Sequence, residues 1–234
     1  MEYVISDVHG CYHTFKKLLG EIDFSEKEDV LYLAGDLTGA GEDSLGLLLD
    51  LCMRPNVYPL WGDQDLLCAE ALRTLGEKLD EEALRALLTG EKKEAFAAWL
   101  SMGGVEIIKA FRELNEEKRG FVLEYFDEFE PYTFTKVGKH VFIILHAGFE
   151  QFEEGKELDE YSAEELAFGS LDYDKRYFRG AYLITGHMPT RSLSPDGSDK
   201  VYKTKAGNIA INCSADEDGR LACLSLDTGK VVYA

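Results

Sequence analysis

Six side chains that can bind a metal ion follow five apolar segments of this sequence. Three are carboxylates and three are imidazoles: Asp7, His9, Asp36, Asp63, His146 and His187. Carboxylate oxygens and imidazole nitrogens suit divalent cations of hard or borderline character. Two such cations ~3.5 to 4 Å apart lower the pKa of a water between them and hold a phosphate in line for attack. The residue types therefore predict a dinuclear site for hydrolysis of a phosphate ester.

The first of these motifs is Ser-Asp-Val-His-Gly at 6–10. Side chains two apart in an extended strand point to the same face, so Asp7 and His9 can reach one ion. A single Asp-x-His triplet is weak evidence, because a histidine at a strand end is more often a surface or capping residue. Five strand ends that all carry potential ligands are hard to assign to packing alone.

Such a site requires strands that end at a common edge. Apolar strands are expected over 3–6, 29–34 and 56–61, and they alternate with helices expected over 11–22 and 45–53. This alternation predicts right-handed crossovers and a parallel sheet whose carboxyl ends gather functional groups. The repetition is the main indication of an α/β architecture.

The rest of the chain divides into a helical stretch and a set of strands. From about 64 to 129 the pattern is helical and charged, which predicts a helical insertion covering one side of the site. Apolar strands over 141–145 and 181–184 deliver His146 and His187. The tail holds strand-like segments separated by turn residues, which predict an antiparallel meander. These segments cover 208–213, 221–226 and 230–233.

Length, charge and cysteine content limit the class of protein. The chain has 234 residues and is expected to form a single domain, 1–234, with the insertion at about 64–129. The net charge of −19 argues against a nucleic-acid duplex as partner, since nothing compensates phosphate repulsion over a broad surface. No apolar run approaches the ~18 residues of a membrane span, and the cysteines show no Cys-x-x-Cys pair. We expect a cytoplasmic protein with reduced thiols and no membrane partner, and the sequence does not set its oligomeric state.

The order and spacing of the motifs resemble the phosphoprotein phosphatase branch of the calcineurin-like metallophosphoesterases, which includes bacterial Ser/Thr protein phosphatases and diadenosine tetraphosphatases. The matching segments are Ser-Asp-Val-His-Gly at 6–10, Gly-Asp at 35–36, His-Ala-Gly at 146–148 and Gly-His-Met-Pro-Thr at 186–190. Trp-Leu-Ser-Met-Gly-Gly at 99–104 is also similar to a family segment. The resemblance implies an α/β fold in which two mixed sheets form a β-sandwich flanked by helices.

The resemblance also implies how the site would work. Asp7, His9 and Asp36 would hold a first metal, and Asp36, Asp63, His146 and His187 a second, with manganese favoured and iron, zinc or magnesium as alternatives. A hydroxide bridging the metals would attack phosphorus directly, as in a Ser/Thr phosphatase acting on a phosphorylated protein or a small phosphoester. The alternatives are a nucleotide polyphosphate hydrolase of the diadenosine tetraphosphate type, and a metal-binding pseudophosphatase that acts as an interaction protein.

Two motifs depart from the family pattern at catalytic positions. Where the family has Asp-Arg-Gly after the second strand, this chain has Gly-Ala-Gly at 39–41. Where the family has Gly-Asn-His followed by Glu or Asp, this chain has Gly-Asp-Gln-Asp at 62–65. Ala40 thus stands where the family has its phosphate-binding arginine, and Gln64 stands where it has the proton-donating histidine. Gly39 stands where the family has the aspartate that orients that histidine.

Asp36, Asp63 and Gln64 are therefore the expected catalytic residues. Asp63 in place of asparagine and Ala40 in place of arginine make the site less positive, so a phosphate dianion is held less strongly. Gln64 can donate a hydrogen bond to a leaving oxygen but cannot give up a proton at neutral pH. General acid catalysis is worth ~10² to 10⁴ in rate, so alkoxide leaving groups should suffer more than phenolates or phosphoanhydrides.

A basic segment could replace the missing arginine. Lys175, Arg176 and Arg179 lie near the place where relatives carry a second phosphate-binding arginine, and the resemblance does not choose among them. Arg176 and Lys175 are the expected substrate-binding residues. An ordinary exposed basic run is the alternative interpretation.

Overall fold

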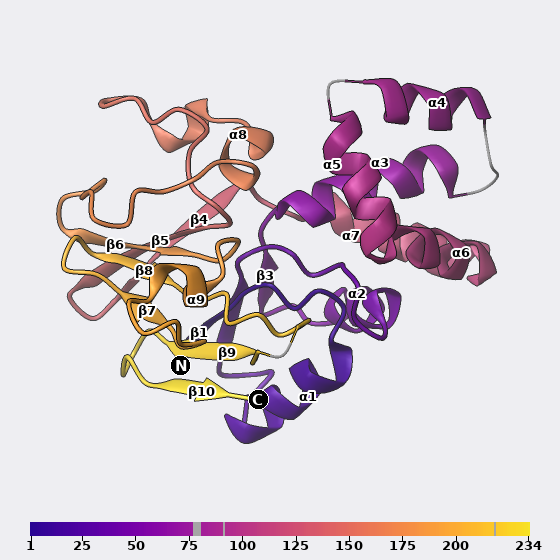
Figure 1. The fold of residues 1–234 in the computed structure, drawn as a ribbon. Coiled ribbons are helices and arrows are strands. Elements are labelled where there is room, and N and C mark those ends of the chain that lie inside the picture. Colours follow the sequence, from indigo (N-terminus) through magenta and orange to yellow (C-terminus); the bar gives the residue numbers. More distant parts are fainter. Residues whose placement is uncertain (77–80, 91, 218) are drawn as a thin grey trace.

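Two stacked β-sheets form the body of the molecule, with a lobe of helices beside them (Figure 1). The computed structural model describes residues 1–76, 81–90, 92–217 and 219–234. Within those residues, one sheet has the order β10 (Val231–Tyr233), β9 (Ala222–Ser225), β1 (Glu2–Ile5), β2 (Val30–Leu33) and β3 (Val57–Pro59). The other has the order β4 (Tyr132–Val137), β5 (His140–Leu145), β6 (Ala181–Thr185), β8 (Asn208–Ala210) and β7 (Tyr202–Lys203). The expected α/β fold with two mixed sheets is confirmed.

Parallel neighbours in each sheet end at the same level. Ile5 pairs with Leu33, and Leu33 pairs with Pro59, so β1, β2 and β3 end side by side. In the second sheet Ile144 pairs with Ile184, and β6 also runs parallel to β8. The predicted parallel arrangement of the first three strands is confirmed, and it brings the segments that follow them to one edge.

A buried apolar layer joins the two sheets. Val4 and Ala34 of the first sheet pack with Ile144, Ile184 and Ile209 on the side of the second. The residues on either side of Val4 belong to a separate cluster on the opposite face of the first sheet. Because neighbouring side chains of a strand point to opposite faces, β1 is buried on both sides. This double burial explains the apolar run from Tyr3 to Ile5.

Helices cover the outer face of the first sheet. α1 (Tyr12–Glu21) and α2 (Ser44–Leu51) contribute Phe15, Leu47 and Leu48 to the cluster on that face. The helices predicted at these two places are confirmed. Their burial fixes the loops that connect the strand ends to the helices.

Consecutive helices occupy the stretch between β3 and β4. They are α3 (Asp63–Leu75), α4 (Glu81–Thr89), α5 (Lys93–Trp99), the π-helical turn η1 (Leu100–Gly104), α6 (Val105–Glu113) and α7 (Glu116–Phe126). Figure 1 shows these helices gathered in a lobe beside the sheets. Trp61, which follows β3, stacks on Phe126 with ring centroids 5.9 Å apart. This contact ties the lobe to the end of β3, while the assignment of 64–129 as an insertion within one domain stays a prediction.

The tail does not form the meander that the sequence predicted. β8 pairs with β6 and β7 in the second sheet, whereas β9 and β10 form a hairpin at the edge of the first. Ile209 of β8 and Leu224 of β9 nevertheless belong to the same layer between the sheets. Alternating apolar residues show that a face is buried but not which of two stacked sheets supplies the strand, so the prediction was wrong on this point.

The remaining helices are short. They are η2 (Leu158–Glu160), α8 (Ala163–Ala167) and α9 (Thr190–Leu193). Over the part of the chain that the structure describes, no helix combines the length and the apolar character needed to cross a bilayer.

Candidate metal centre

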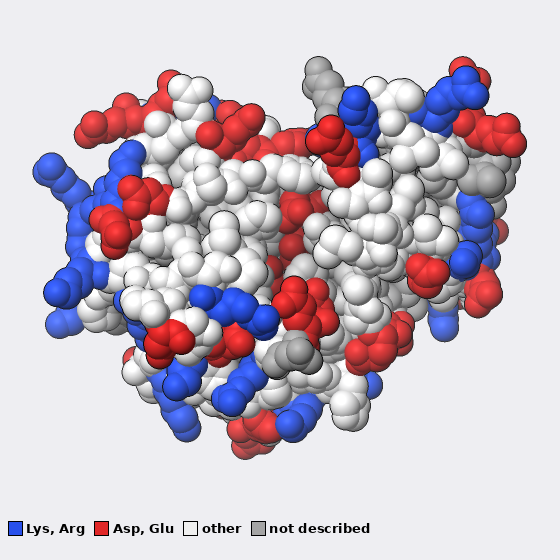
Figure 2. Space-filling model, in the orientation of Figure 1, with Lys and Arg blue, Asp and Glu red and all other residues white. Residues whose placement is uncertain are grey.

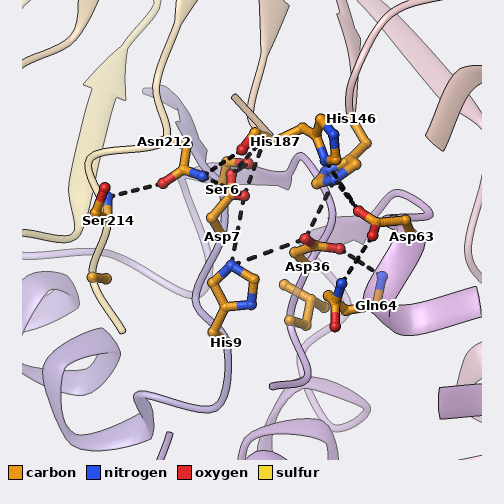
Figure 3. A network of polar contacts seen from close by, with 12 residues as sticks. Ser6, Asp7, His9, Asp36, Asp63, Gln64, His146, His187, Asn212 and Ser214 are labelled. Atoms are coloured by element: carbon orange, nitrogen blue, oxygen red, sulfur yellow. Dashed lines mark hydrogen bonds and ion pairs between the residues drawn. The ribbon is translucent and has the colours of Figure 1, made fainter. Parts of the chain in front are cut away.

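The six predicted ligands converge where β1, β2, β3, β5 and β6 end (Figure 3). Their donor atoms form two groups, and within each group all of these atoms lie within 4.8 Å of one another. One group contains Asp7, His9 and Asp36, and the other contains Asp36, Asp63, His146 and His187. Asp36 belongs to both groups, so two cations held there would share its carboxylate.

The backbone is unusual at the ligand positions. Among the described residues, six that are not glycine have a positive φ, and four of these lie in the cluster: Asp7 (52°), His9 (48°), Asp36 (54°) and His187 (55°). Left-handed φ values are uncommon for residues with a Cβ, cost free energy and are concentrated at functional sites. The left-handed backbone conformation after these strands therefore directs the side chains into the cluster.

Glycines beside the ligands allow the carboxylates to pack closely. A Cβ at Gly62 would overlap the Oδ1 atom of Asp36, and a Cβ at Gly186 would overlap the Oδ2 atom of Asp7. A larger residue at either place would push a carboxylate out of the cluster. The Gly-Asp and Gly-His pairs of the sequence therefore reflect this shortage of space.

Hydrogen bonds fix the orientation of the shared carboxylate and of His146. The Gln64 N–H donates to Asp36 Oδ1 at 3.0 Å, which leaves Oδ2 facing His146 Nε2 at 3.4 Å. His146 Nδ1 lies 2.9 Å from the carbonyl oxygen of Ala34. Because a carbonyl oxygen only accepts, Nδ1 carries a proton, so the ring in its neutral form would present its lone pair at Nε2 to the cluster. This tautomer is the one that can bind a cation there.

Asp63 connects the two imidazoles that come from the second sheet. Its Oδ1 lies 3.1 Å from His146 Nε2 and 3.1 Å from His187 Nδ1, while its Oδ2 accepts from Gln64 Nε2 at 2.9 Å. Burial opposes the ionisation of Asp63, but the hydrogen bonds with the imidazoles outweigh it and hold the pKa of this carboxyl well below its usual range. An ionised carboxylate next to two imidazoles is a suitable donor set for one divalent cation.

The pKa values of Asp7 and His146 show why divalent cations suit this cluster. Burial raises the pKa of Asp7 to about 6, and the nearby Asp36 adds to the rise. Burial acts to lower the pKa of His146, but Asp36 and Asp63 outweigh it and raise that pKa well above its ordinary value. Figure 2 shows acidic side chains along the groove between the sheets and the helical lobe. Divalent cations would balance this concentration of negative charge, so the residues present fit a pair of such ions.

Two polar residues that the sequence analysis did not single out support the cluster. The buried Asp65 carboxylate accepts hydrogen bonds from the backbone N–H groups of Leu37 (3.0 Å) and Thr38 (2.9 Å), which shapes the turn after β2. The Asn212 amide donates to Asp7 Oδ1 at 2.9 Å. A sequence signal existed for each, because Asp65 ends the Gly-Asp-Gln-Asp motif and Asn212 follows an apolar strand as the ligands do.

The altered family positions lie close to the cluster. A Cβ at Gly39 would lie 2.8 Å from the Cβ atom of His9, so an aspartate at this position would not fit unless His9 moved. Ala40 is exposed and lies beside Gly103 of η1, where an added Cβ would be 3.1 Å from the Ala40 Cα. The glycine at 39 therefore has a steric reason that the sequence did not show.

Lys175 and Arg176 are not brought to the cluster. Arg176 Nη2 donates to the carbonyl oxygen of Lys205 at 3.0 Å, just before the start of β8. Lys175 Nζ lies 4.6 Å from the centre of the Phe152 ring. His187, by contrast, follows the opposite end of the neighbouring strand β6. Motif spacing could not show which strand end this segment approaches, and substrate contact by these two side chains stays a prediction that the geometry does not favour.

Two stacked sheets with Asp and His donors at their strand ends are the arrangement that the resemblance to the calcineurin-like metallophosphoesterases implied. A family model described as calcineurin-like phosphoesterase matches residues 3–217, and the chain belongs to this family. The matched range contains all six residues of the cluster.

Individual proteins also resemble this chain. It is 31% identical over 99 residues to a symmetrical bis(5'-nucleosyl)-tetraphosphatase of Wigglesworthia glossinidia brevipalpis, and the aligned stretch covers 42% of this chain but only 36% of that relative. A solved structure with a provisional assignment as a diadenosine tetraphosphatase superposes with a TM-score of 0.67 at 17% identity, covering 100% of this chain and 92% of that one. A metallophosphoesterase from Sphaerobacter thermophilus gives a TM-score of 0.55 at 15% identity, covering 99% and 86%. These structural likenesses support the fold.

Proposed function

We propose that this protein is a dinuclear metal-dependent hydrolase that cleaves a phosphoanhydride bond of a nucleotide polyphosphate. The observation that carries the proposal is the pair of donor groups that share Asp36. The six residues of the cluster would hold two divalent cations, and manganese is the ion we favour for this mixed set of oxygen and nitrogen donors. Cations held there supply Lewis acidity and an activated water at neutral pH.

The substrate class depends on Gln64. Its Nε2 donates to Asp63 at 2.9 Å, and a neutral amide cannot transfer a proton to a leaving group. A serine alkoxide needs that proton, whereas the phosphate released from an anhydride leaves as a stable anion. This difference favours a polyphosphate over the phosphoserine ester that the resemblance first suggested. A relative named as a tetraphosphatase supports the same choice.

Purified protein supplied with manganese tests the substrate preference. We expect kcat/KM for diadenosine tetraphosphate to exceed that for a phosphoserine peptide by ~100-fold or more, since general acid catalysis is worth ~10² to 10⁴. p-Nitrophenyl phosphate serves as the control, because its phenolate leaves without a proton and isolates the effect of the missing acid. Equal rates on the phosphoserine peptide and diadenosine tetraphosphate would overturn the argument from Gln64.

A second candidate is a metal-binding protein without efficient catalysis that acts as an interaction protein. The observation that favours it is the absence of a basic side chain at the positions where the family binds phosphate. Position 40 carries alanine, and the Arg176 side chain is bonded to Lys205 away from the cluster.

Restoring family residues separates the two candidates. Position 39 must stay glycine because His9 takes the space, so the variant is Gln64→His combined with Ala40→Arg. A hydrolase that works without these groups should change its turnover of diadenosine tetraphosphate by less than ~10-fold, below the usual worth of a general acid. If the variant instead gains activity where the parent shows only the rate of free manganese, the parent is a binding protein.

A further inference from the structure

One amide side chain bridges the two sheets at the cluster. Asn212 follows β8 and is 5% exposed. Its Nδ2 donates to Asp7 Oδ1 at 2.9 Å and to the carbonyl oxygen of His187 at 2.7 Å, and its Oδ1 accepts from the Ser214 N–H at 2.8 Å (Figure 3). Asp7 follows strand β1 of the first sheet, and His187 follows strand β6 of the second. Asn212 therefore contacts one member of each donor group.

The orientation of this amide follows from its partners. A carboxylate and a backbone carbonyl only accept hydrogen bonds, so the NH₂ group of Asn212 must face Asp7 and His187. The backbone N–H of Ser214 only donates, so the amide oxygen must face Ser214. Both hydrogens and the oxygen are used, which leaves the side chain one favourable orientation.

Hydrogen bonds fix both backbone polar groups of His187. Its N–H donates to both oxygens of Asp7 at 3.1 Å, and its carbonyl accepts from Asn212. The φ angles of Asp7 and His187 are 52° and 55°, a conformation that persists only where the surroundings impose it. The triangle formed by these three residues supplies that constraint.

We propose that Asn212 is a positioning residue that locks the two donor groups to each other, so that the two cations are bound in a fixed relation. The inference rests on the proposed metal centre but not on the identity of the substrate. A hydrogen-bond donor is needed at this position, because an acceptor there would face the Asp7 carboxylate and the His187 carbonyl. Partners that orient metal ligands in this way typically contribute 10- to 100-fold in metal affinity.

The isosteric variant Asn212→Asp tests the proposal. It keeps an acceptor for the Ser214 N–H but removes both donors. Asn208 offers a matched control, since it lies in β8, the strand that Asn212 follows, and is 2% exposed. It donates both amide hydrogens, to the carbonyl oxygens of Tyr173 (2.9 Å) and Lys175 (2.8 Å). Asn208→Asp thus makes the same chemical change in a buried amide that does not bond to the cluster.

The measurements are the number and the affinity of bound Mn²⁺ ions, by titration calorimetry after chelation, with thermal melts of the chelated proteins. We expect Asn212→Asp to weaken Mn²⁺ binding about 10- to 100-fold, and Asn208→Asp to keep the parent affinity even where it lowers the melting temperature as much. Asn212→Ala removes the donors without adding charge and decides the question if the aspartate variant does not fold.

Two results would overturn the inference in different ways. Parent affinity in the Asn212 variants, or an equal loss in Asn208→Asp, would remove the positioning role and leave the metal centre intact. A parent protein that binds no Mn²⁺ would remove the metal centre itself, and the proposed function with it.

Discussion

Asp36→Asn is expected to lower phosphoanhydride hydrolysis by about 10³-fold and to reduce the manganese bound at both donor groups. Lewis-acid assistance is worth several kcal/mol, and each ~1.4 kcal/mol is a factor of ten in rate. The asparagine can still accept the Gln64 N–H at Oδ1, so the turn should persist. Its NH₂ group would replace Oδ2, the atom that faces His146 Nε2 at 3.4 Å and His9 Nε2 at 3.9 Å. A single atom change thus removes the oxygen that both groups share.

The matched control for this variant is Asp174→Asn. Asp174 is exposed, and the substitution removes the same charge away from the cluster. Rates on diadenosine tetraphosphate and manganese per chain should stay at parent values in the control. An Asp36→Asn protein that retains a tenth of the parent rate would show that the shared carboxylate is not needed, and the dinuclear proposal would fail.

The cluster itself could be predicted from the sequence because every ligand follows an apolar run. Parallel strands that end in register bring such residues together without any knowledge of loop structure, as the pairs from Ile5 to Pro59 show. Placing His146 and His187 in the cluster needed further information, because they follow strands of the second sheet. Only the family resemblance implied that this sheet is stacked on the first.

The contacts of Asn212 could not be predicted, because they join residues that share no motif. Asn212 and Asp7 are 205 residues apart, and nothing in the local pattern connects a tail strand with the first strand. The tail prediction failed for the same reason, since β8 and β9 bury similar faces in different sheets. Gly39 could be seen as a lost aspartate but not as the neighbour of His9. Contacts of this kind depend on the packing of the whole fold.

The chelated protein is expected to lose stability as the pH rises from 5 to 8, contrary to the usual behaviour of acidic groups. Burial raises the pKa of Asp65 to about 7 and that of Asp7 to about 6, so the folded chain binds these protons more tightly than the unfolded chain. The contribution of these two protonated carboxyl groups to the free energy of unfolding is fully present below about pH 4. It is lost as the pH rises towards 7. Burial acts to lower the pKa of His9 and His146, but the neighbouring carboxylates raise both, and their contribution is also lost with rising pH.

The depressed pKa of Asp63 acts in the opposite direction, but that contribution is lost only as the pH falls below about 4, outside the window from 5 to 8. Manganese should reverse the trend, because it binds the deprotonated ligands and adds ~2.7 kcal/mol at 100 times its dissociation constant. Thermal melts at pH 5, 6, 7 and 8, with chelator and with manganese, measure both effects. Asp65→Asn is the control, since it should flatten the pH dependence of the chelated protein while the increment from manganese remains. A chelated protein that is most stable at pH 8 would contradict the electrostatic account of the cluster, because uncompensated buried carboxylates are costly where they are ionised.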